Sequence, residues 1–200
     1  MKRGSMKFWL CVSLLLAAPM TAVSGGQLAL QSAASLKPLR ANETLLAGLR
    51  PGRDTFEIAE KKLRSKPTPN QEELGYREWV DTCSGRAIRV ELDGKPVIQS
   101  ITITSLESQD GKCEGKRANF LDSKNWETGL GLRIGDSQDR VSSIYGEPNS
   151  SGPASKNGKE LALMYYQFDW AGSDFPQVME VLCARETGRV VEITLAFPSL

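Results

Sequence analysis

The sequence predicts an α+β protein made of two tandem copies of a small unit, in which an N-terminal helix packs on an antiparallel sheet of three to four strands. The first observation behind this prediction is a segment, Gly-Leu-Arg-x-Gly, that occurs at residues 48–52 and again at 131–135. The second is that each occurrence precedes a stretch with helical periodicity and then stretches that alternate like strands. We therefore expect a first unit at residues 42–104, a connector at 105–128 and a second unit at 129–200.

The start of the chain has the features of a secretory signal peptide, which we assign to residues 1–24. Lys2, Arg3 and Lys7 precede an apolar run that is shorter than the roughly 20 residues needed to span a bilayer. The small residues that follow, at positions 22–24, are typical of a signal-peptidase cleavage site. We expect an exported protein, with no integral membrane segment after signal removal and with a flexible arm at residues 25–41.

The charge balance argues against two classes of partner. The whole chain has 25 Lys and Arg residues and 24 Asp and Glu residues. Removal of the three basic residues of the signal leaves 22 positive charges, so the mature formal charge is about −2. Because no long block of like charge occurs, neither a nucleic acid nor an anionic membrane surface is an expected partner.

Each unit is expected to open with a short amphipathic helix. Asp54 and Ser137 are the expected N-caps, because short polar side chains accept hydrogen bonds from free backbone N–H groups there. Prolines after each stretch, and Gly146 in the second unit, are expected to end the helices. The apolar stripes expected to face the sheets are Phe56, Ala59 and Leu63 in the first unit and Val141, Ile144 and Tyr145 in the second.

Strands follow each helix, with tight hairpin turns expected at Asp93-Gly94 and Thr187-Gly188. Residues 149–160, rich in Ser, Gly, Asn and Lys, are expected to form a surface loop. In the strand after that loop, alternate residues from Ala162 to Trp170 share the helix-facing side, so Tyr165 faces the opposite side. The expected strands lie at residues 76–81, 88–92 and 98–103, and at 161–170, 177–185 and 189–197.

The mature chain has three cysteines, which allow at most one internal disulfide. Cys83 precedes the first strand of the Asp93-Gly94 hairpin, and Cys113 follows its second strand. We therefore predict a Cys83–Cys113 disulfide across the open end of this hairpin. Cys183, inside an apolar strand, is expected to be a buried small hydrophobic residue rather than a nucleophile.

The chain contains no histidine, which removes the commonest general base and excludes Ser-His-Asp, Cys-His and His-metal mechanisms. There is no Cys-x-x-Cys spacing either, so neither a metal site nor a cofactor is expected. Catalysis would have to depend on a pair of carboxylates, as in a secreted hydrolase. Because the Asp and Glu residues are scattered as on a solvated surface, we expect a protein that is not an enzyme.

The second unit resembles a known family through three features: Gly135-Asp136-Ser137, then Val141, then Tyr-Gly-Glu-Pro at residues 145–148. This pattern resembles the small repeat of bacterial exported proteins that includes the small lipoprotein of the outer-membrane β-barrel assembly machinery. In tandem duplication, the unit is similar to the architecture of the secreted β-lactamase inhibitor protein family. The resemblance implies two antiparallel sheets side by side, helices packed on one side, and opposite faces free to contact another protein. It also implies a periplasmic or extracellular location in a bacterium. It does not imply inhibition of β-lactamases, because fold does not determine function.

Tyr76, Trp79, Tyr165 and Trp170 lie on the expected strands, and Tyr and Trp are the residues that most often anchor protein interfaces. The same aromatics can equally belong to the core. We expect an exported module that binds another protein through its sheet faces, such as an envelope assembly factor or an inhibitor-like protein. A carboxylate-dependent secreted hydrolase and a purely structural envelope protein are the alternatives.

Overall fold

The computed structural model describes residues 41–69, 75–92, 94, 96–106, 126–168 and 176–197. All of them belong to one compact unit, Lys37–Leu200. The elements are α1 (Phe56–Leu63), β1 (Tyr76–Asp81), β2 (Arg86–Leu92), β3 (Ile98–Ser105), α2 (Gln138–Tyr145), β4 (Ser150–Lys156), β5 (Lys159–Phe168), β6 (Gln177–Ala184) and β7 (Val190–Ala196).

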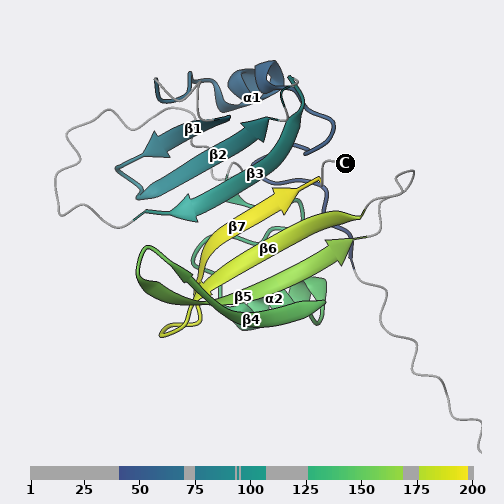
Figure 1. Cartoon of the computed structure of the whole chain (residues 1–200), viewed down its shortest axis with the longest axis vertical. Helices are drawn as coiled ribbons and strands as arrows, with labels where there is room; N and C mark the ends of the chain where they lie inside the picture. Colours follow the sequence, from purple (N-terminus) through teal and green to yellow (C-terminus); the bar gives the residue numbers. More distant parts are fainter. Residues whose placement is uncertain are drawn as a thin grey trace, which may run out of the picture. The chain divides into compact units, whose positions relative to one another are not determined.

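The seven strands of the described residues belong to one antiparallel sheet with the order β1-β2-β3-β7-β6-β5-β4 (Figure 1). The prediction of an α+β fold with two tandem units, each with its own sheet, is therefore wrong: the described part of the chain is β-rich, with two short helices. The two halves are joined by pairing of β3 with β7, from Ser100 opposite Ala196 to Thr104 opposite Glu192. This pairing removes two strand edges that two separate sheets would have left with unpaired N–H and C=O groups.

One face of this sheet is a continuous apolar layer. Cross-strand neighbours on this face are each 2 % exposed or less, and they form a row from β1 to β5. The period of two along every strand places these residues on the same side. The row consists of Trp79, Ile88, Ile103, Ile193, Val181 and Met164.

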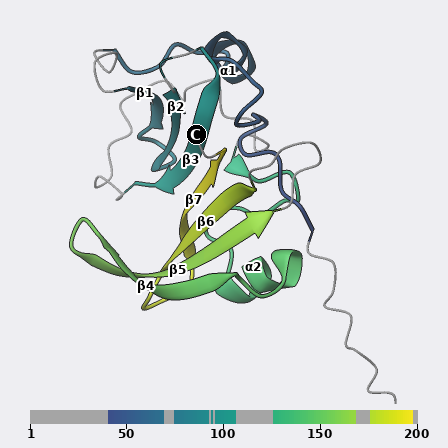
Figure 2. The ribbon, with the colours of Figure 1, turned by 45° about the vertical axis from the view of Figure 1, so that its right-hand side comes forward.

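Both helices pack on this apolar face (Figure 2). In α1, Ala59 and Leu63 are buried, and the Phe56 ring beside them lies 6.1 Å from the Trp79 ring. In α2, the Tyr145 ring lies 5.7 Å from the ring of Tyr166 on β5. One core cluster of buried residues therefore includes side chains from both halves of the chain.

The helix caps partly follow the sequence. Ser137 is the N-cap of α2, as predicted, and its side chain accepts the N–H of Arg140. For α1 the prediction was one residue early: Thr55, not Asp54, is the N-cap and accepts the N–H of Ile58. The Asp54 carboxylate instead accepts the backbone N–H of Arg50, at 3.1 Å, and holds the turn before the helix.

The two Gly-Leu-Arg-x-Gly segments make matching backbone contacts. The Gly52 N–H donates to Ile98 O at the start of β3, at 2.7 Å, and the Gly135 N–H donates to Val190 O at the start of β7, at 2.8 Å. The second glycine of the first segment, Gly52, has a φ of +74°, and a Cβ there would lie 2.8 Å from the Phe197 side chain. These segments therefore fix each helix relative to a strand. That they arose by duplication stays a prediction.

The expected surface loop at residues 149–160 is also corrected. It forms β4, a two-residue turn and the start of β5. Asn157 and Gly158 both have positive φ angles, 52° and 75°, which a tight hairpin turn requires and which Asn-Gly accommodates well. The segment lacks the apolar alternation of a strand because β4 is a largely exposed edge strand, held by backbone pairing with β5.

Candidate protein-binding face

The side of the sheet opposite the helices, called the outer face below, is lined by the alternate residues of every strand. None of the described helices covers it (Figures 1 and 2). Its central row crosses all seven strands and is built of polar side chains and one tyrosine. This row is Glu78, Arg89, Thr102, Thr194, Glu180, Tyr165 and Ser150.

The two edges of the sheet are poorly suited to pairing with a further strand. Along β1, the Thr68 N–H donates to Glu78 O at 2.8 Å, and the indole N–H of Trp79 donates to Ser65 O at 3.0 Å. The segment after α1 therefore lies against this edge. On the opposite edge, β4 contains Pro153, which has no N–H to donate. A partner would therefore contact the outer face more readily than an edge.

In the β1–β3 part of the outer face, the charged side chains of Glu78, Arg89 and Glu91 all have partners within the sheet. The Arg89 guanidinium pairs with Glu78 at 3.1 Å and lies 4.4 Å from the centre of the Tyr76 ring. The Ser100 hydroxyl donates to the Glu91 carboxylate at 2.7 Å. We call these five residues the paired patch.

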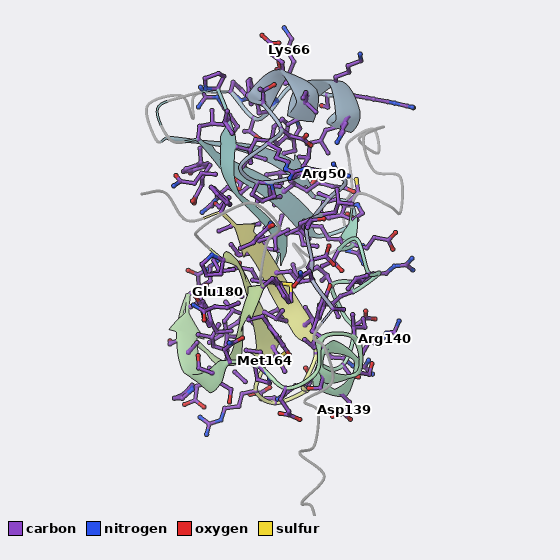
Figure 3. The ribbon with its side chains drawn as sticks, turned by 90° about the vertical axis from the view of Figure 1, so that its right-hand side faces the viewer. Arg50, Lys66, Asp139, Arg140, Met164 and Glu180 are labelled. Carbon is purple, nitrogen blue, oxygen red and sulfur yellow. The ribbon has the colours of Figure 1, made fainter. Side chains whose placement is uncertain are left out.

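The β5–β6 part differs, although it also combines a glutamate with a tyrosine. Glu180 is exposed and directly opposite Tyr165, and neither side chain makes an ion pair or hydrogen bond with the described residues. The aliphatic residues Leu163, Val178 and Leu182 surround this pair on the same face and are half-buried. We call these five residues the open patch; Figure 3 shows Glu180 and helix α2 on opposite sides of the sheet.

The nearby cations of the outer face are already paired. Lys156, at the end of β4, donates to the Glu192 carboxylate on β7. Arg185, just after β6, pairs with Glu160 at 3.1 Å. The carboxylate of Glu180 is thus left without a counter-charge among the described residues.

The aromatic residues predicted to bind are separated by the sheet. Tyr76 and Tyr165 lie on the outer face and are half-buried. Trp79 lies on the helix-covered face and is 1 % exposed, so it belongs to the core and cannot contact a partner. Trp170 lies outside the described residues. Sequence reasoning missed Glu180, although a single charged residue within the apolar strand Gln177–Ala184 was a usable signal.

The sequence analysis also missed a buried carboxylate. Glu43 is 2 % exposed, and its oxygens accept the backbone N–H groups of Gly129 and Leu130 at 3.1 and 3.0 Å. The Tyr145 hydroxyl donates to the same carboxylate at 2.7 Å and also contacts the Thr128 hydroxyl at 2.6 Å. Burial and the Glu43 charge raise the pKa of Tyr145 well above its ordinary value. Because this cluster is fully hydrogen-bonded, it anchors the N-terminal segment rather than offering a ligand site.

Cys183 is a free thiol and fully buried, as expected. Burial raises its pKa to about 11, which disfavours the nucleophilic thiolate. The predicted partner of Cys83, Cys113, lies outside the described residues, so the disulfide stays a prediction.

Within the described ranges, no group of three or more Cys, Asp or Glu side chains is arranged to hold a metal ion. The helices in these ranges are also too short and too polar for any of them to cross a membrane. No protein-family model matches the chain, and neither a curated protein nor a solved structure matches it.

Proposed function

We propose that this protein is an exported, non-catalytic protein-binding module that contacts its partner through the open patch. The observation that supports this proposal is a combination on one surface that no described helix covers: a carboxylate and a tyrosine hydroxyl without partners among the described residues, and three half-buried aliphatic side chains. Protein interfaces combine an apolar centre with polar groups that find partners on binding, and tyrosine is among the residues that most often anchor them.

The other features of the chain are compatible with this proposal. The signal-like N-terminus supports export, and the absence of histidine makes the commonest catalytic mechanisms impossible. The protected sheet edges favour docking on a face over addition of a strand. A role as an envelope assembly factor or as an inhibitor-like protein follows only from the family resemblance and is part of the proposal.

Site-specific photo-crosslinking tests the proposed surface. The photoreactive residue p-benzoylphenylalanine replaces Tyr165 in one variant and Ile58 in the control. Ile58 lies on α1, on the other side of the sheet, and is 37 % exposed. In cells that export the chain, we expect a protein adduct of defined mass at position 165 and none at 58. Absence of an adduct at 165, or equal adducts at both positions, contradicts the proposal.

A further inference from the structure

We infer that the partner presents a cationic side chain, best an arginine, to Glu180 and Tyr165. This inference rests on the proposed function and adds the chemistry of the partner. It starts from the two glutamate–tyrosine pairs of the outer face, of which only one has an arginine partner among the described residues.

The paired patch shows how a complete arrangement looks on this sheet. Arg89 lies directly opposite Glu78 and diagonal to Tyr76, so one guanidinium forms an ion pair and also lies over an aromatic ring. Arginine suits both contacts, because its planar group matches a carboxylate and stacks on an aromatic face.

The open patch also contains a glutamate and a tyrosine, Glu180 and Tyr165, but no arginine or lysine. Tyr165 lies directly opposite Glu180, and the neighbour of Glu180 on β7 is Thr194, whose hydroxyl is hydrogen-bonded to Thr102 at 2.9 Å. Lys156 pairs with Glu192 and is therefore committed elsewhere. No described residue of the chain supplies a positive charge to Glu180.

A partner that covers the open patch must compensate this carboxylate. Val178 and Leu182 lie two residues before and after Glu180 on the same face of β6, so a covering partner would remove water from around the charge. Removing water from an unpaired carboxylate is strongly unfavourable, as a general rule. A neutral apolar partner would incur this cost, whereas an arginine would pair with Glu180 and stack on Tyr165.

Selection from a random peptide library displayed on phage tests this inference with the purified protein. We expect the enriched peptides to contain an Arg or Lys, and we expect Glu180→Gln to raise their Kd by about thirtyfold. The matched control is Glu91→Gln, in the paired patch on the same face, which should leave Kd unchanged. A charge swap adds a test that a merely structural role would fail: peptides with Arg→Glu should bind Glu180→Arg better than they bind the wild type.

Leu182→Asp and Leu163→Asp, checked for folding by circular dichroism, show whether the selected peptides occupy the open patch. If the peptides lose affinity for these variants but lack a cation, or bind Glu180→Gln as tightly as the wild type, the inference is wrong while the proposed surface stands. If no selected peptide is sensitive to either substitution, the proposed function itself fails.

Discussion

The paired patch and the open patch lie on the same face of the same sheet, and each contains a glutamate near a tyrosine, but only the paired patch contains an arginine. In the paired patch, Arg89 joins Glu78 and Tyr76 into a closed set of contacts. In the open patch, Glu180 and Tyr165 stand opposite one another with no cation among the described residues. The comparison teaches that the residue type alone does not decide whether a surface glutamate or tyrosine can bind a partner. Its cross-strand neighbours decide whether it is already engaged within the sheet.

The largest effect on stability is expected at the buried Glu43 carboxylate, all of whose partners lie within the chain. It provides a reference for Glu180, which has no such partners among the described residues. Tyr145→Phe removes the hydroxyl that donates to buried Glu43 and should lower the free energy of unfolding by about 2 kcal/mol. Urea denaturation measures this change. Tyr166→Phe is the matched control, since that buried hydroxyl donates to the Gly146 carbonyl rather than to a carboxylate, and should cost less. Equal losses would show that the Glu43 charge adds nothing.

The raised pKa of Tyr145 also predicts how the free energy of unfolding depends on pH, which the same urea denaturation can measure. Its folded pKa is raised above the unfolded value of about 10, so the neutral hydroxyl stabilises the fold fully below pH 10. Above that pH, the unfolded state ionises first and stability falls. Wild type should therefore lose stability more steeply than Tyr145→Phe as the pH rises beyond about 10.

An intermediate effect is expected from giving the open patch an arginine of its own. Gln167 is exposed, lies two residues from Tyr165 on β5 and is diagonal to Glu180. Gln167→Arg should occupy Glu180 within the chain and weaken binding of the selected peptides about tenfold, equivalent to about 1.4 kcal/mol. Gln167→Met, similar in length but uncharged, is the control. Equal binding by both variants would mean that the two patches do not differ by their missing cation.

The smallest effect is expected in the paired patch. Arg89→Met keeps an aliphatic stem but removes the ion pair with Glu78 and the contact with Tyr76, at a cost of up to about 1 kcal/mol in unfolding free energy. Thermal denaturation at low and high salt measures it, and the difference from wild type should shrink with salt. Peptide binding to the open patch should stay unchanged. A loss of peptide binding would mean that the two patches act as one surface.

Local pattern predicted most of the strands, because alternation and turn residues act over a few positions. The strand at residues 76–81 matches β1, and the assignment of Tyr165 to the side opposite the helix agrees with the register of β5. The joining of β3 to β7 could not be seen in this way. It pairs segments far apart in sequence, and nothing in either strand alone identifies its neighbour.

The parts of the candidate site that escaped prediction share a physical cause. Trp79 and Tyr76 lie in one strand, and only the direction of the pleat relative to α1 decides which of them is buried. Glu43 lies in a segment without periodicity, and its partners come from residues about 90 positions away. Tertiary contacts, which a single sequence does not display, decide both cases.

The position of β7 has a consequence for how the protein is assembled. This strand, the last of the described strands, lies between β3 and β6, in the interior of the sheet. The hydrogen bond between the side chains of Thr194 and Thr102 joins residues that are 92 positions apart. Pairing across such a separation requires a long loop to close, which slows folding. During synthesis from the N-terminus, β3 and β6 therefore each keep an open edge until β7 emerges, and a chain cut short before β7 would expose two strand edges to aggregation.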